Sequence, residues 1–243
     1  MMIFGGGSLD VFYIDKIEQS IKKEVTDKER KKDLLNDLKE YNKTVKGFKK
    51  EMKSQLKELK KKNLEITTTE TWYREFYDSR MKARIELQKT FIEQRLILQN
   101  KIAQDEWDAI MNRAKDATAK LAEKERKDEM KKKYNNAFKD QENAIINSVG
   151  DQNRRKALLD ALFVFKQLYI QIDEAYDSIN VNESEFLTDK NATEEEMIKL
   201  ASLLNEQRVK LFAGNTLFLK TMHSYTSEEE WKPIMKAYNK LLD

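Results

Sequence analysis

Few residues in this 243-residue chain have the types and spacing that catalysis requires. His223 is the only histidine and cysteine is absent, so a Ser-His-Asp arrangement has one candidate base and a Cys-His arrangement has no nucleophile. A di-iron bundle takes a Glu-x-x-His motif from each of two helices, which one histidine cannot supply. H-E-x-x-H motifs, phosphate-binding glycine loops and dinucleotide fingerprints are also absent. We therefore expect no catalytic residues, no cofactor and no metal, in a protein that is not an enzyme.

The most distinctive combination of polar and aromatic residues occurs twice. "DEWDAIM" begins at Asp105 and "EEWKPIM" begins at Glu229, 124 residues later. In each motif the second acid would lie in the first turn of a helix, where it favours the helix dipole, while Trp, Ile and Met share one face. We expect core-facing anchors at two equivalent helix starts rather than an active-site signature. The anchor residues are Glu106, Trp107, Ile110 and Met111 in the first motif, and Glu230, Trp231, Ile234 and Met235 in the second.

The same offset of 124 residues aligns other parts of the chain. "VTDKERKKDLLNDL" from Val25 lies over "VGDQNRRKALLDAL" from Val149, with Val, Asp, Arg, Lys and three Leu in common. Ordered matches at one constant shift, including a rare Trp, indicate a tandem duplication. Arg84 falls on Arg208 in this alignment. We expect each of these arginines to form a structural ion pair with an acid on a neighbouring helix, such as Glu106 or Glu230, rather than a ligand site.

Composition and helix-capping signals predict how each copy folds. One proline, six glycines and 37% charged residues are typical of long helices, so we expect an all-α fold. "TEEE" and "SEEE" are capping boxes, and the other starts carry Thr or Asp at the N-cap. The expected caps are Thr26 or Asp27, Thr68 or Thr69, Asp151, Thr193 and Ser227. The expected helices run to about residues 63 and 101 in the first copy and 180 and 224 in the second, and a further helix opens at each Trp motif.

A long helix is expected to connect the two copies. No helix breaker occurs between Asp105 and Val149, and the stretch "EKERKDE" from Glu123 is charged all round. A polar stretch inside an unbroken helix is typical of a solvated bridge. We therefore expect a helical bundle over residues 1–122, a charged bridge over 123–129 and a second bundle over 130–243, together elongated. One bundle folded back on itself is the alternative. In architecture alone, three-helix units that share a linker helix resemble spectrin-type repeats.

The two copies differ in charge. Residues 27–63 contain 14 Lys or Arg and 7 acids, while the counterpart 151–187 contains 4 and 7. The first helix therefore has a basic solvated face, for which an anionic partner and an ordinary solvated surface are the two interpretations. The counterpart has apolar residues on more than one face, as in a helix that is central in its bundle or covered by a second chain. Opposite charges on the two copies would allow head-to-tail self-association. The basic face comprises Lys43, Lys46, Lys49, Lys50, Lys53, Lys57 and Lys60.

Charge also limits the class of partner. The net charge is only +3, so the chain as a whole has little attraction for nucleic acid or anionic lipid. Aromatic residues do not alternate with the lysines as base-stacking platforms would require. We therefore expect a protein partner or self-association, with a membrane surface as a weaker alternative and nucleic acid not expected. No run of 18 apolar residues occurs, so no transmembrane helix is predicted.

These features predict a non-enzymatic structural or protein-interaction protein that acts as a rod, a spacer or a self-associating scaffold. An extracytoplasmic helical chaperone that binds unfolded clients is the alternative. Its basis is that the T/S-x-x-E helix openings resemble the Leu-Thr-x-x-Gln motifs of small periplasmic helical chaperones, although neither the Leu-Thr pair nor the Gln is present. The start "MMIFGGGSLDVFYI" lacks the features of a signal peptide, and the residues do not distinguish the cytoplasm from an extracytoplasmic compartment.

Overall fold

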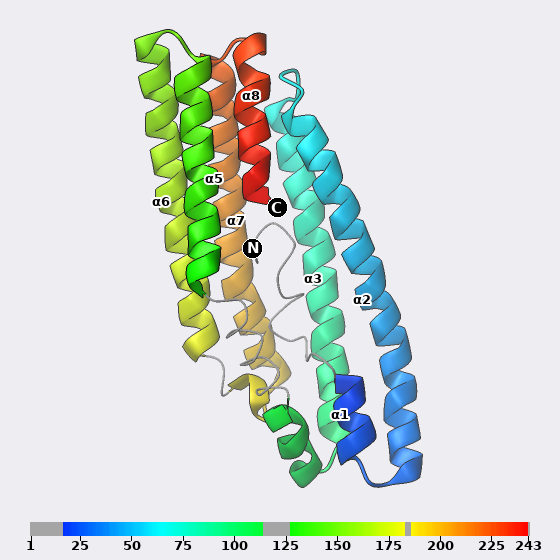
Figure 1. The fold of residues 1–243 in the computed structure, drawn as a ribbon. Coiled ribbons are helices and arrows are strands. Elements are labelled where there is room, and N and C mark those ends of the chain that lie inside the picture. The colour runs from blue at the N-terminus through cyan, green and yellow to red at the C-terminus, as the bar shows by residue number, and fades with distance from the viewer. Residues whose placement is uncertain (1–16, 114–126, 183–185, 243) are drawn as a thin grey trace.

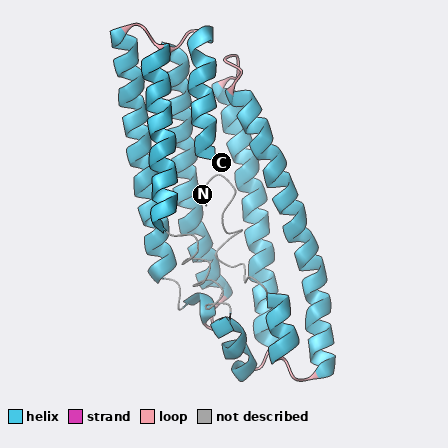
Figure 2. Cartoon of the chain, viewed as in Figure 1, coloured by secondary structure: helices cyan, strands magenta, loops and turns pink. Residues whose placement is uncertain are grey.

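The computed structural model describes residues 17–113, 127–182 and 186–242, and every regular element in them is a helix (Figures 1 and 2). The predicted all-α fold is therefore confirmed for this part of the chain. The elements are α1 (Ile17–Glu24), α2 (Lys28–Asn63), α3 (Glu70–Lys101), a helix over residues 104–113, α5 (Lys127–Ser148), α6 (Gln152–Asn182), the 3₁₀ turn η1 (Phe186–Thr188), α7 (Glu194–Tyr225), α8 (Glu228–Tyr238) and η2 (Asn239–Leu242).

Local side-chain hydrogen bonds fix the helix starts. Thr193 and Ser227 form complete capping boxes with Glu196 and Glu230, as the sequence predicts. Asp27 accepts a 2.7 Å hydrogen bond from the backbone N–H three residues later, and Thr69 and Asp151 cap their helices in the same way. Each cap satisfies a backbone donor that has no partner inside the helix. The structure selects Asp27 and Thr69 at the two starts where the sequence allows two candidates.

The inner face of α2 follows a seven-residue repeat. The apolar residues at this spacing are Leu34, Leu38, Tyr41, Val45, Phe48, Met52 and Leu59, and all seven are buried. Residues three and four apart lie on one side of a helix, so a single stripe can pack along its whole length. This stripe faces α3, and Tyr41 contacts the ring of Phe91 at a centroid distance of 5.5 Å.

The two halves of the chain lie side by side. Figure 1 shows α3 and α7 as neighbours that run in opposite directions, with α2 on one outer edge and α6 on the other. Interactions join α3 to α7 near both ends, from Glu70–Lys220 at 3.1 Å to Gln99 and the Ala192 carbonyl at 3.1 Å. The folded-back arrangement is therefore the one present in the described residues.

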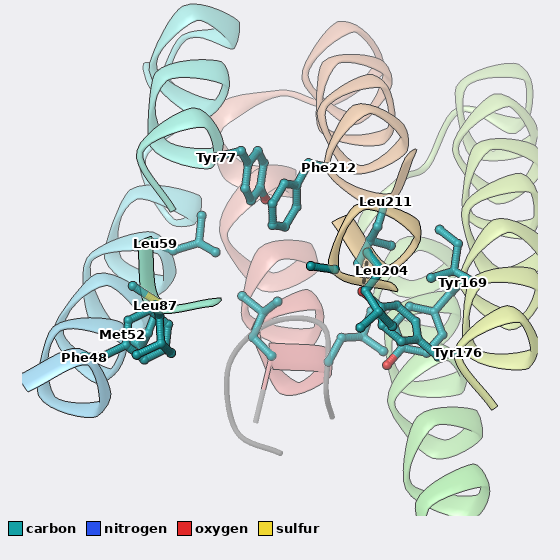
Figure 3. Close-up of a cluster of buried hydrophobic side chains, with 14 of the residues drawn as sticks. Phe48, Met52, Leu59, Tyr77, Leu87, Tyr169, Tyr176, Leu204, Leu211 and Phe212 are labelled. Carbon is teal, nitrogen blue, oxygen red and sulfur yellow. Dashed lines mark hydrogen bonds between the residues drawn. The ribbon is translucent and has the colours of Figure 1, made fainter. Parts of the chain in front are cut away.

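Aromatic side chains form the centre of the contact between α3 and α7. The rings of Tyr77 and Phe212 stack with centroids 4.5 Å apart and an angle of 12° between their planes, as Figure 3 shows. Leu59, Met52 and Leu87 fill the space between α2 and α3 on one side of this stack. Tyr169, Tyr176, Leu204 and Leu211 form the corresponding cluster between α6 and α7.

The predicted bridge between the copies falls largely on residues that the structure does not describe. The helix over residues 104–113 and α5 lie on either side of residues 114–126. The continuous helix from 105 to 149 and the domain boundaries at 122 and 130 therefore stay predictions. None of the helices in the described ranges has a stretch apolar enough, over sufficient length, to cross a lipid bilayer.

Candidate functional site

The second Trp motif forms a hydrogen-bonded helix start. Glu230 accepts the backbone N–H of Ser227 at 2.8 Å and also binds the Arg154 guanidinium through both carboxylate oxygens, at 2.7 and 3.0 Å. Two parallel N–H to oxygen bonds fix the geometry of such a pair. Asp151 accepts the backbone N–H of Arg154, so the start of α6 and the start of α8 are tied together.

The first Trp motif repeats this arrangement 124 residues earlier. Glu106 accepts the backbone N–H of Ala103 at 3.3 Å and binds the Arg30 guanidinium at 2.7 Å. It also accepts the backbone N–H of Thr26 at 3.1 Å. Arg30 and Arg154 are the ion-pair partners of these glutamates, and they were not predicted from the sequence. Both arginines lie in the aligned stretches from Val25 and Val149. Their identical position at the 124-residue offset is the sequence feature that could have identified them as partners.

The two indoles reach across to the opposite half of the molecule. Trp107 donates its ring N–H to the Thr188 carbonyl at 2.8 Å, and Trp231 donates to the Asn63 carbonyl at 2.9 Å. Thr188 lies between α6 and α7, whereas Asn63 ends α2 before the turn into α3. Each indole thus holds the helix–helix loop of the other half, an arrangement we call the loop clasps. The other anchor residues Ile110, Met111, Ile234 and Met235 are buried beside them.

Additional side chains strengthen each loop clasp. Arg95 donates to the Asp189 carbonyl at 3.0 Å while its guanidinium lies 5.3 Å from the centre of the Trp107 ring. Burial lowers the pKa of this guanidinium to about 10, so it stays protonated at neutral pH. On the other loop, Asn239 donates to the Lys60 carbonyl at 2.8 Å and accepts from the Asn63 side chain at 2.8 Å. Both loops are therefore positioned by contacts more than 80 residues apart in sequence.

Arg84 and Arg208 lie at matching positions of α3 and α7, as expected, but they do not pair with Glu106 or Glu230. Glu106 and Glu230, the acids expected to pair with them, instead bind Arg30 and Arg154. Arg84 lies about 25 Å along α3 from the end of that helix, too far for its side chain to reach Glu106. Both arginines are buried, with their guanidinium carbons 4.9 Å from the Phe48 ring centre and 5.8 Å from the Tyr176 ring centre. They pack against aromatic rings in the middle of α3 and α7.

The Arg154–Glu230 pair makes stability sensitive to acid. The Arg154 guanidinium and the cap at Ser227 lower the pKa of the Glu230 carboxyl below its usual value of 4.5. A carboxyl whose pKa is lower in the folded state stabilises the protein above the unfolded pKa, and this stabilisation is lost as the pH falls through the folded pKa. We expect Glu230→Gln to flatten the decrease in thermal stability below about pH 4.5, measured by circular dichroism melts. Glu229→Gln, an exposed acid in the same turn, should leave that decrease unchanged; an equal effect of both would contradict the assignment.

The lysines predicted to form a basic face lie on the outside of α2. Lys43, Lys46, Lys49, Lys50, Lys53 and Lys57 are exposed, and Lys60 is half-buried. A surface hollow of about 440 Å³ between α1 and α2 is lined by Glu18, Leu35, Lys39, Asn42, Lys43 and Lys46. The polar side chains of this hollow are half or fully exposed, so it does not exclude water as a catalytic site does.

Apolar side chains are exposed on α6 and α7. Phe163 and Val164 on α6 and Leu217 on α7 are each 63% exposed, and Val209 on α7 is 55% exposed. The apolar residues on more than one face of α6 are therefore not explained by a central position in its bundle, which was one of the two sequence interpretations. Phe163 and Val164 are neighbours in the chain, and contiguous exposed apolar side chains are typical of binding sites for other molecules.

In the described residues, the candidate catalytic groups are metal ligands and the single histidine. Nowhere in the described ranges do three Asp, Glu or His side chains gather as ligands for one metal ion. His223 is exposed at the end of α7, where its ring meets the edge of Trp231 at a centroid distance of 5.9 Å.

Comparison of the chain with protein-family models, with curated proteins and with solved structures finds no match.

Proposed function

We propose that this chain is a non-enzymatic protein-interaction scaffold made from two copies of one helical unit. The observation that supports the scaffold best is the exposed apolar surface of Phe163, Val164 and Leu217. Water contact with such side chains is unfavourable by about 25 cal/mol for each Å² of apolar surface, and a protein partner would remove that contact. The apolar surface of α6 borders exposed acids, Asp160 and Glu174, which suits a partner with basic and apolar groups.

Matched burial supports the duplication. Many residues at the 124-residue offset are buried in both halves, even where their identity differs. Arg84 and Arg208, both buried, show that this holds for a charged residue as well as for apolar ones. The apolar pairs include Ile21 and Ile145, Val25 and Val149, Leu34 and Leu158, Leu38 and Leu162, Tyr41 and Phe165, Val45 and Tyr169, Leu87 and Leu211, and Leu98 and Met222.

A scaffold fits the geometry better than an end-to-end rod. Because α3 and α7 pack side by side, the second unit makes the molecule wider and does not extend its length. Each proposed unit is still long, because its helices of 31 to 36 residues each extend roughly 45–55 Å. A chaperone for unfolded, extracytoplasmic clients is the second candidate, because the exposed apolar side chains could also bind an extended client segment.

Sedimentation velocity over a wide range of concentrations tests the scaffold. We expect the average mass of the full chain to rise with concentration. Replacing Val164 and Leu217 by Ser should reduce this association because it removes exposed apolar area without disturbing the buried core. The matched control is Ile97→Ser, which removes an exposed apolar side chain from α3. A chain that stays monomeric throughout would refute self-association, and suppression of a model client's aggregation by that monomer would then favour the chaperone.

A further inference from the structure

The outer faces of α2 and α6 occupy equivalent positions in the two units but differ in chemistry. Lys39, Lys46 and Lys50 on α2 correspond, at the 124-residue offset, to Phe163, Ile170 and Glu174 on α6. All six side chains are exposed. Figure 1 shows α2 and α6 at opposite outer edges of the molecule. Because these six side chains are exposed, internal packing does not require the difference between them.

Each outer face has the spacing that suits contact with another helix. The exposed positions 160, 163, 167, 170 and 174 of α6 are separated by three and four residues in turn. The α2 positions 43, 46, 50, 53 and 57 follow the same pattern. Rows with this 3.5-residue period stay in contact as two helices wind around each other. The row on α6 extends about 21 Å along its helix.

Charges and apolar groups on the two rows are complementary. The exposed acids Asp160 and Glu174 lie fourteen residues apart on α6, and Lys43 and Lys57 lie fourteen residues apart on α2. Figure 1 shows that α2 and α6 run in opposite directions, so an antiparallel contact would place Asp160 near Lys57 and Glu174 near Lys43 of another copy. The exposed Gly47 between these lysines lies opposite Ile170 in this register, and it has open space where a side chain would begin, which leaves room for the Ile170 side chain. Lysine stems can cover the remaining apolar surface.

We propose that the outer face of α6 binds the outer face of α2 of a second copy of this chain. This proposal rests on the scaffold function and names its partner. The contact joins two different surfaces, so a bound pair still offers one free α2 face at one end and one free α6 face at the other. Heterologous contacts of this type form open chains when they do not close into a ring.

Two variants, each with one altered face, test the contact. Phe163→Lys with Val164→Glu gives α6 the residue types of the matching α2 positions and leaves the α2 face intact. Lys43→Glu with Lys50→Glu and Lys57→Glu alters α2 and leaves the α6 face intact. We expect each variant alone to associate roughly a hundredfold more weakly than the natural chain in sedimentation velocity. An equimolar mixture should form one-to-one dimers that do not grow further, because it contains one working face of each kind.

The control replaces the exposed lysines Lys199, Lys210 and Lys232 by Glu, which changes the net charge equally away from the α2 face. Association should survive in this variant. If the natural chain associates but the α2 variant associates equally well, the proposed contact is refuted while the scaffold function stands. If the α6 variant associates as the natural chain does, the contact is likewise refuted. A natural chain that is monomeric at every concentration removes both proposals.

Discussion

Trp231→Ala is expected to destabilise the folded chain by about 3–5 kcal/mol, and Trp107→Ala by a similar amount. Both side chains are buried, with exposed fractions of 2% and 0%, so truncation leaves a cavity in addition to the lost burial of the ring. The Asn63 and Thr188 carbonyls also lose their donors. Chemical unfolding followed by circular dichroism measures the change.

Two further variants separate the causes of this loss. Trp231→Phe keeps most of the apolar volume but removes the indole N–H. We expect this variant to lose about 1–3 kcal/mol of unfolding free energy, because the Asn63 carbonyl has no donor. Trp72→Ala is the matched control, because Trp72 is half-buried and lies at the edge of the core. Its cost should be clearly smaller. If both clasp variants unfold at the same midpoint as the natural chain, these tryptophans lie at the surface. A binding role for them would then be open again.

Because each loop clasp joins the two halves, either substitution should affect the whole molecule. Trp107 belongs to the first half and holds the loop between α6 and α7, while Trp231 belongs to the second and holds the turn that follows α2. Loss of one clasp therefore removes support from a loop in the other half. We expect far-ultraviolet dichroism and tyrosine fluorescence to report one shared unfolding transition in both variants.

The second large effect is expected at Asn215, which links three helices in the core. Its amide donates to the Tyr77 hydroxyl of α3 and its carbonyl accepts from the Tyr238 hydroxyl of α8 at 2.5 Å. All three residues are buried, and burial raises the pKa of both phenols, so they remain neutral and able to donate a proton. Asn215→Leu leaves two buried hydroxyls without this partner. We expect a loss of about 2–5 kcal/mol in unfolding free energy.

Replacing the whole group is the informative control. Asn215→Leu combined with Tyr77→Phe and Tyr238→Phe also removes the two hydroxyls that lose their amide partner in the single variant. This triple variant should recover most of the lost stability, because substituting both partners of a buried hydrogen bond by apolar groups can be nearly neutral. If the triple variant is less stable than Asn215→Leu alone, the cost lies in packing and not in the unsatisfied hydroxyls.

Helix starts and the inner face of α2 could be predicted because they depend on neighbours within one or two turns. The Thr193 cap bonds to a backbone N–H three residues away, and Leu38, Val45 and Met52 recur at the helical repeat. Arg30 and Arg154 could not be identified as the partners of the two glutamates in this way. Each pair spans 76 residues, and a chain rich in charged residues offers many acids and bases at that separation.

The sequence by itself therefore determined the all-α class, most of the helix starts and the apolar stripe of α2, and it indicated a repeat at 124 residues. Only the tertiary structure decided that the halves lie side by side, that each indole binds the loop of the opposite half, and that Phe163 and Val164 remain exposed on α6. The physical reason is the distance along the chain between the residues that interact. Capping and periodicity follow from local backbone geometry, whereas a contact between distant segments depends on which helix faces are already covered by others.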